Sequence, residues 1–231
     1  MRNVKKLTLI GSVHIDPLGA GSLYKRLLEL RPDIITVEIS PFSISYRNKM
    51  LANWLSSFKK AQETLTIQER EHLQLKLLYR SLLIPFEWVV SKAYAKKSSI
   101  PCVPIDIGEI SKQELPRWSK ELLSSFNLKL LVKQKDKDIL EFFDSKYSTA
   151  QKILFENGND FVFNLALNTE EFKKRDKIMA KRILRIIKHK DNLVHVGGWQ
   201  HLITSNKDSL CSILERHTKR IAFSLERILL R

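Results

Sequence analysis

The chain has 231 residues, and 43% of them are hydrophobic. This share is enough for a sizeable core and excludes global disorder, while the length suits a single α/β domain with a helical insertion or cap at approximately residues 43–97. Lys and Arg total 40 against 25 Asp and Glu, which gives a formal net charge of +15. Such a charge suits nucleic acid, anionic lipid or an acidic partner, and it also occurs in basic cytosolic enzymes that bind no polyanion.

Cysteine use and hydropathy indicate where the protein works. Neither Cys102 nor Cys211 has a nearby Cys or His at metal-finger spacing, which excludes zinc ribbons and dense disulfide scaffolds. We expect buried, reduced thiols. The apolar run Leu7–Ile10 is shorter than the hydrophobic region of a secretory signal, and no stretch of about 20 apolar residues occurs. A cytoplasmic protein without a transmembrane segment is therefore expected.

The first elements predict a parallel sheet. The run Leu7–Ile10 is short, apolar and β-prone, which is typical of a strand buried on both faces. Ser22 can then cap a helix that ends at Pro32, and Ile34–Ile39 follows as the second strand. A strand, a helix and a strand within about forty residues form a βαβ unit, and its strands should be parallel.

A helical pattern separates the second strand from the third. Residues 43–97 contain no glycine, and Pro85 is placed to open the last helix of this block. The expected buried face of that helix consists of Phe86, Val89, Val90 and Ala93. The third strand is expected at Pro101–Ile107, and its prolines favour an edge position.

The rest of the chain predicts more helices and the remaining strands. Glu109–Asn168 is expected to be mainly helical, with a break at Asn157-Gly158-Asn159. The clearest helix covers Thr169–Lys190, and Asn168 can cap it. The later expected elements are a strand at Leu193–Val196, a helix from about His201 to His217 and a last strand at Ile221–Phe223. The fold class is thus α/β, with a mostly parallel central sheet, flanking helices, and largely helical insertions between strands two and three and between strands three and four.

One four-residue pattern occurs near both ends of the chain. Gly11-Ser12-Val13-His14 follows the first strand, and Gly198-Trp199-Gln200-His201 follows the fourth. We expect each glycine to let the backbone turn sharply where the strand stops. Because ligands of open parallel sheets bind outside the carboxyl ends of the strands, both histidines are expected there, together with Glu38 and Asp106.

These residue types predict a metal-dependent hydrolase. His14, His201 and Glu38 can bind one divalent ion and leave a position open for water or substrate. The ion would lower the pKa of bound water toward ~7, and a second carboxylate could act as general base. Asp106 is expected to support this catalysis.

Four segments resemble the TraB/TIKI group, which belongs to a superfamily with erythromycin-esterase-like and ChaN-like proteins. They are Gly-x-x-His after the first strand, Arg31-Pro32-Asp33 leading to Val37-Glu38, Arg175-Asp176-x-x-Met179-Ala180, and Val196-Gly197-Gly198-Trp199-Gln200-His201-Leu202. They occur in matching order over most of the chain, and the middle helices are the least specific part.

The resemblance implies a parallel-sheet α/β fold with pseudo-symmetric halves and, for TIKI-like members, a peptidase dependent on manganese or cobalt. The ion expected in this chain is therefore manganese, cobalt or zinc. It carries over His14, Glu38 and His201 as metal-site or catalytic residues, and Arg175 and Asp176 as catalytic residues that support the site. The chain departs from the pattern in two ways. It has Asp106-Ile107 where many relatives have Asp-Arg, and it has no C-terminal membrane segment in the printed sequence.

Several residues admit more than one interpretation. Arg47 could bind a substrate carboxylate bidentately, or could be a solvated arginine on a helix face. Arg175 and Asp176 could orient a ligand histidine, or could form a buried ion pair that anchors their helix. Asp16 could be an extra ligand or a turn residue before Pro17. His195 alternates within a strand and is expected to be a hydrogen-bonded core histidine.

Two other functions remain open. One is a nucleic-acid-binding protein, which the basic stretch Lys173–Lys190 favours, although no aromatic residues interleave its bases and a solvated basic face also explains it. The other is a non-enzymatic protein that binds metal or haem on the same fold. The favoured substrate is a peptide or another molecule with an amide or ester bond.

Overall fold

The computed structural model describes residues 5–156 and 169–231, and its centre is a five-stranded, all-parallel sheet with the order β3-β2-β4-β1-β5. The strands are β1 (Lys5–Ser12), β2 (Ile34–Val37), β3 (Cys102–Pro104), β4 (Asn192–Gly198) and β5 (Phe223–Leu229). The expected α/β class, with its largely helical insertions, is confirmed. The expected break at Asn157-Gly158-Asn159 lies outside the described residues, as does Asn168.

The position of β4 brings the two ends of the chain together. It lies between β1 and β2, and its register with β1 places Gly11 opposite Gly197 and Ser12 opposite Gly198. Every residue of β2 is buried, and Leu7–Ser12 of β1 are buried as well, which agrees with the continuous apolar runs expected of strands covered on both faces. The carboxyl ends of β1, β2 and β4 consequently meet at one edge of the sheet.

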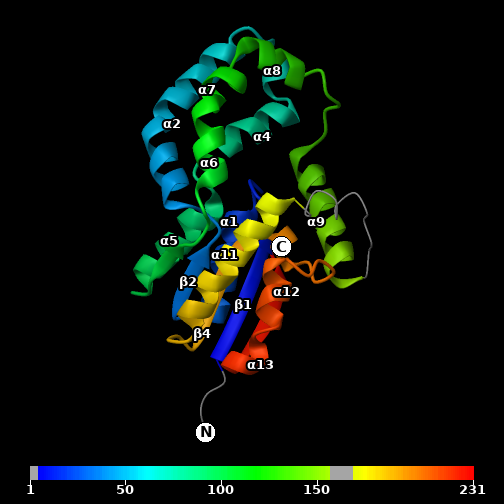
Figure 1. Cartoon of the computed structure of the whole chain (residues 1–231). Helices are drawn as coiled ribbons and strands as arrows, with labels where there is room; N and C mark the ends of the chain where they lie inside the picture. The colour runs from blue at the N-terminus through cyan, green and yellow to red at the C-terminus, as the bar shows by residue number, and fades with distance from the viewer. Residues whose placement is uncertain (1–4, 157–168) are drawn as a thin grey trace. The chain divides into compact units, whose positions relative to one another are not determined.

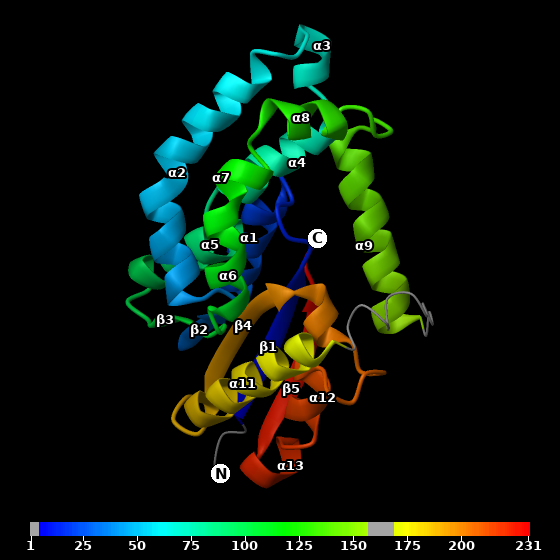
Figure 2. The same cartoon turned by 45° about the horizontal axis from the view of Figure 1, so that its top comes forward.

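The chain forms two compact units. The first consists of the described residues within 1–39, 86–107 and 145–231 and contains the whole sheet. Its helices are α1 (Gly19–Leu30), α5 (Phe86–Lys97), most of α9 (Ile139–Phe155), α11 (Glu170–Ile187), α12 (Leu210–Glu215) and α13 (Thr218–Ile221), with the 3₁₀ helix η2 (Trp199–Leu202). Figures 1 and 2 show α11, α12 and α13 on one face of the sheet and α1 and α5 on the other.

The core of the first unit lies between the sheet and the face of α11. Leu7 and Leu9 of β1 contribute to it, and Met179, Ile183 and Ile187 of α11 are fully buried there. These α11 residues recur at helical spacing, so one face of the helix packs on the sheet while the opposite face stays in solvent.

The second unit consists of residues 40–85 and 108–144 and is helical. Its helices are α2 (Pro41–Gln62), α3 (Ile67–Arg70), α4 (Leu73–Leu82), α6 (Glu109–Glu114), α7 (Trp118–Glu121) and α8 (Ser125–Leu131), with the 3₁₀ helix η1 (Leu115–Arg117). Trp54, Phe58, Leu82 and Leu128 are among its buried core residues. Helix α5 falls in the stretch expected as an insertion but belongs to the first unit.

Four local expectations differ from the structure. Helix α1 begins at Gly19, so Ser22 lies within it and does not cap it. The buried face of α5 consists of Glu87, Trp88, Ser91, Tyr94 and Ala95. The described cap of α11 is Thr169, whose side chain accepts a hydrogen bond from the backbone N–H of Phe172. The expected helix over His201–His217 is three short helices, because the chain bends between η2 and α12 and again after Glu215.

The last strand also differs from its expected position. Ala222 adopts a left-handed conformation that ends α13, and β5 begins only at Phe223. None of the helices in residues 5–156 and 169–231 is long and apolar enough to cross a membrane.

Candidate functional site

The glycines of the paired motif bring backbones close together. Gly11 and Gly198 lie within β1 and β4, and no glycine in the described residues has a positive φ. The expected sharp turn is therefore wrong. A Cβ on Gly11 would lie 2.8 Å from the Cα of Trp199, so the missing side chain is what lets η2 pack against β1.

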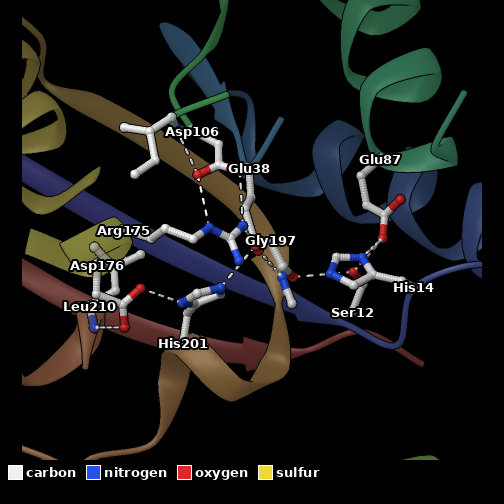
Figure 3. Close-up of polar contacts among 12 residues, drawn as sticks. Ser12, His14, Glu38, Glu87, Asp106, Arg175, Asp176, Gly197, His201 and Leu210 are labelled. Atoms are coloured by element: carbon white, nitrogen blue, oxygen red, sulfur yellow. Dashed lines mark hydrogen bonds and ion pairs between the residues drawn. The ribbon is translucent and has the colours of Figure 1, made fainter. Parts of the chain in front are cut away.

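His14 follows β1 and is held from behind by a buried carboxylate. Its Nδ1 lies 2.7 Å from Oε1 of Glu87, and the same oxygen accepts a hydrogen bond of 2.7 Å from the hydroxyl of Ser12 (Figure 3). The side chain of Glu87 is 3% exposed, whereas that of His14 is 49% exposed. The imidazole thus has one nitrogen fixed by protein and the other directed away from Glu87.

His201 follows β4 and lies between two carboxylates. Its Nδ1 is 2.5 Å from Oδ1 of Asp176, and its Nε2 is 2.9 Å from Oε1 of Glu38. The second oxygen of Asp176 accepts the backbone N–H of Leu210 at 2.8 Å. The ring of Phe172 stacks on the imidazole with centroids 4.7 Å apart. His201 is therefore fixed by both nitrogens and by one ring face.

Glu38 is held by groups from α11 and β4, in addition to His201 of η2. Arg175 of α11 donates to Oε1 of Glu38 at 2.7 Å, and the backbone N–H of Gly198 donates to Oε2 at 2.7 Å. The guanidinium also donates to both carboxylate oxygens of Asp106, at 3.1 and 2.9 Å (Figure 3). Asp106 fixes Arg175 in this bidentate pair, and Arg175 in turn fixes Glu38.

A small space at Gly198 lies next to both His14 and Glu38. A Cβ on Gly198 would lie 2.9 Å from Nε2 of His14 and 3.5 Å from Oε2 of Glu38. A Cβ on Gly197 would lie 2.8 Å from the same Glu38 oxygen. The two glycines therefore leave room for the outer nitrogen of His14 and one oxygen of Glu38, which lie 2.9 and 3.5 Å from the position where a side chain at 198 would begin.

The charges of the cluster separate the pKa values of its acids and bases. Burial opposes ionisation of Glu38, but the positive charges of His201 and Arg175 lower the pKa of Glu38 well below its usual range. Desolvation likewise opposes protonation of the histidines. The negative charge of Glu87 nevertheless raises the pKa of His14 to about 9, and Glu38 and Asp176 raise the pKa of His201 to about 10.

Among the described residues, the three expected metal ligands are not grouped around one position that could hold an ion. Nδ1 of His201 contacts Asp176, as a ligand histidine does with a supporting carboxylate, and Nε2 contacts Oε1 of Glu38. The carboxylate of Glu38 already forms an ion pair with the guanidinium of Arg175. No group of three or more His, Cys, Asp or Glu side chains among the described residues is arranged to hold a metal ion. Metal binding stays a prediction for which this arrangement supplies no ligand set.

Six of the seven expected site residues lie in one connected cluster. They are His14, Glu38, Asp106, Arg175, Asp176 and His201. Arg47 belongs to the second unit, where its Nη1 donates to the carbonyls of Ser81 and Leu83 at 2.5 and 3.0 Å and its guanidinium lies over the ring of Trp118. Its guanidinium therefore joins helices of that unit. His195 is buried with Nδ1 3.0 Å from the hydroxyl of Thr36, as expected of a core histidine.

The main residue that the sequence did not indicate is Glu87. It lies on the buried face of α5 with Ser91 and Tyr94, at spacings of four and three residues. That spacing is a helical signal, but it becomes visible only if a carboxylate is accepted on a core face. Ser12 of the first motif also contributes, because its hydroxyl contacts both Glu87 and the carbonyl of Gly197.

Comparisons of the chain with protein-family models, with curated proteins and with solved structures find no match. The resemblance to the TraB/TIKI group therefore rests on the quoted motifs alone.

Proposed function

We propose that the chain is a hydrolase of an ester or amide bond in which Glu38 acts as general base and His14 as general acid. The observation that carries the proposal is that the outer imidazole nitrogen of His14 and one carboxylate oxygen of Glu38 both lie next to the space at Gly198. Acid–base pairs of enzymes have this arrangement, with each partner fixed by a further group. The choice of an ester or amide bond follows the resemblance to TIKI-like hydrolases.

The proposed reaction needs one water molecule. Its oxygen attacks the acyl carbon while one of its protons passes to Oε2 of Glu38. The bond from the acyl carbon to the leaving oxygen or nitrogen then breaks, and the leaving atom takes the proton from Nε2 of His14. The proton on Glu38 returns to His14 through solvent, which restores both groups. The opposite pKa shifts of the two residues set the resting states that this reaction starts from, because Glu38 is ionised and His14 is protonated at neutral pH.

The surrounding residues have positioning roles in this proposal. Glu87 and Ser12 fix the ring of His14, as a carboxylate behind a catalytic imidazole does. Arg175 and His201 keep Glu38 ionised and prevent its rotation, and Asp106 and Asp176 fix those two residues in turn. The network extends through hydrogen bonds from α5 to α11, so displacement of one partner would shift the reacting atoms of His14 or Glu38.

The test is hydrolysis of a panel of p-nitrophenyl esters and unstructured peptides by the full chain. On any hydrolysed substrate, kcat/KM should fall by about 10²–10⁴-fold in His14→Gln and in Glu38→Gln. The matched control is His189→Gln, which changes an exposed histidine after α11 and should leave kcat/KM unaltered. Circular dichroism of each variant separates lost chemistry from lost folding.

Three outcomes decide against the proposal. Hydrolysis of no ester or amide in the panel would contradict a hydrolase of this class. Full activity of a folded His14→Gln variant would show that His14 is not the general acid. Activity that is lost with a chelator and restored by manganese, cobalt or zinc would support the metal-dependent mechanism in place of the acid–base pair, whereas the proposal expects activity to survive chelation.

A further inference from the structure

A basic groove lies beside α11 and is lined by none of the residues of the candidate site. It has a volume of about 700 Å³ and is lined by residues of α11, α12 and α13 and of the turn between the last two. Its six Lys and Arg residues are Lys177, Lys181, Arg185, Lys188, Arg216 and Arg220. No carboxylate lines the groove among the residues that the structure describes. Leu184, Ile213 and Ile221 add aliphatic surface.

Most of these cations have no counter-charge within the described chain. Lys177 lies 3.4 Å from Asp208, and Arg216 donates to the carbonyl of Lys207. The other four basic side chains make no hydrogen bond or ion pair with the described residues. Like charges gathered in a groove repel one another, and a bound anion removes that repulsion.

We infer that this groove binds the phosphate backbone of a nucleic-acid duplex, without regard to its sequence. Lys177, Lys181, Arg185 and Lys188 recur at spacings of four, four and three residues and so form one stripe along α11. At 1.5 Å per residue the stripe is roughly 16 Å long. A duplex carries one negative charge per ~1.7 Å of its axis, so several phosphates lie within reach of a stripe of this length.

The number of charges and the nature of the lining favour this ligand over others. A ligand with one or two anionic groups would leave most of the six cations uncompensated. Single strands are held by bases stacked on aromatic rings, and no Phe, Tyr or Trp lines the groove among the described residues. A bilayer surface is flat, whereas a concave groove can take the ridge formed by a duplex backbone. Contacts to phosphates alone carry no sequence information, so binding should be sequence-independent.

The test is fluorescence anisotropy of the full chain with two labelled 20-base-pair duplexes of unrelated sequence, titrated at several salt concentrations. Both duplexes should bind with similar affinity. With about six phosphate contacts, the slope of log K against log salt should be roughly −5. The variant Lys181→Glu/Arg185→Glu changes two exposed residues and should weaken binding at least tenfold, with a slope shallower by about 2.

The matched control is Lys25→Glu/Lys96→Glu, which makes the same change in net charge on α1 and α5, on the other face of the sheet. It should change the affinity by less than about threefold, because long-range charge is screened at physiological salt. Equal weakening by both double variants would overturn the inference, since binding would then depend on net charge alone.

Other ligands are further outcomes of the same experiment. Tighter binding to the single strand of either duplex would overturn the assignment to duplex. So would binding to vesicles that contain phosphatidylserine, if it is lost in Lys181→Glu/Arg185→Glu while duplexes do not bind. Hydrolysis by the candidate site should be unaffected in the groove variant, because none of the six cations belongs to the network around Glu38.

Discussion

At Gly198 the lack of a side chain is what lets His14 and Glu38 approach one space. The backbone there has φ −63° and ψ 140°, which alanine adopts readily. The added Cβ would lie 2.9 Å from Nε2 of His14 and from Oε1 of Gln200. Both atoms end flexible side chains and can move aside. The substitution therefore acts on the position of the proposed acid more than on folding.

We predict that Gly198→Ala lowers kcat/KM at least tenfold while the free energy of unfolding changes by less than ~1 kcal/mol. Hydrolysis assays together with urea denaturation check both parts. A variant with unchanged hydrolysis would mean that this space is not where the reaction occurs.

Gly11→Ala is the informative comparison, because it should lower the stability of the fold, which Gly198→Ala should leave nearly unchanged. Its Cβ would lie 2.8 Å from the Cα of Trp199, which is backbone and cannot move without shifting η2. We expect a loss of ~1–3 kcal/mol in the free energy of unfolding, measured by the same urea denaturation. Stability equal to that of the parent chain would show that β1 and η2 are less closely packed than the structure has them.

Among elements, α11 has the widest role, because it supplies Arg175 and Asp176 to the site and the basic stripe to the groove. Its N-terminus is capped by Thr169, whose hydroxyl accepts the N–H of Phe172 at 3.2 Å. We predict that Thr169→Ala lowers the free energy of unfolding by about 1 kcal/mol and that Thr169→Ser restores most of it, since serine keeps the accepting oxygen. Equal stability of the alanine and serine variants would contradict this cap.

Helix α5 explains why the sequence did not reveal Glu87. The apolar residues Phe86, Val89, Val90 and Ala93 suggest one buried face, but Val89 is 50% exposed and Ala93 is exposed. The buried face in the structure is rotated from this expected face and includes the carboxylate of Glu87 and the hydroxyl of Ser91. Burial of Glu87 is offset by its contacts with His14 and Ser12, and those partners lie far away in the sequence. Periodicity rests on apolar residues and cannot anticipate such a face.

The strand-end residues could be predicted because their cause is local. His14, Glu38, Asp106 and His201 each follow an apolar run, and parallel strands bring such ends to one edge. What they do there could not be predicted. The sequence suggests a metal because it contains the ligand types, whereas the structure pairs His201 with two carboxylates and Glu38 with Arg175. Which partner each group finds is decided by packing between distant segments.

At the scale of the whole molecule, the strand order decides the site. Apolar runs buried on both faces are alike, so nothing in them indicates that β4 pairs between β1 and β2. The division into two units also depends on packing between distant segments. The sequence places α5 in the helical block, whereas in the structure it packs with α1 in the first unit. Arg47 follows Glu38 closely in sequence, but its guanidinium binds carbonyls of the second unit.

The buried network also predicts how stability depends on pH. The pKa values of His14 and His201 are raised above 6.5, so their contribution is fully present below about pH 6.5 and is lost as pH rises through about 9 and 10. The pKa of Glu38 is lowered, and burial lowers the pKa of His195 to about 4, so their contributions are lost as pH falls. Stability should be highest near pH 6–7.

Urea denaturation between pH 4 and pH 10 checks this dependence. Glu87→Gln should flatten the alkaline side, because it removes the charge that raises the pKa of His14. A free energy of unfolding that rises steadily from pH 7 to pH 10 would contradict the sign of both histidine shifts.

The most direct test of the proposed acid–base pair is the pH dependence of kcat/KM in the parent chain and in Glu87→Gln. This quantity reports the ionisation of the free enzyme. We predict a plateau through neutral pH and a fall centred near pH 9 as His14 loses its proton, with the fall moving toward pH 6.5 in the variant. An alkaline limb that Glu87→Gln leaves in place, or a rate that rises through pH 9, would contradict His14 as the acid.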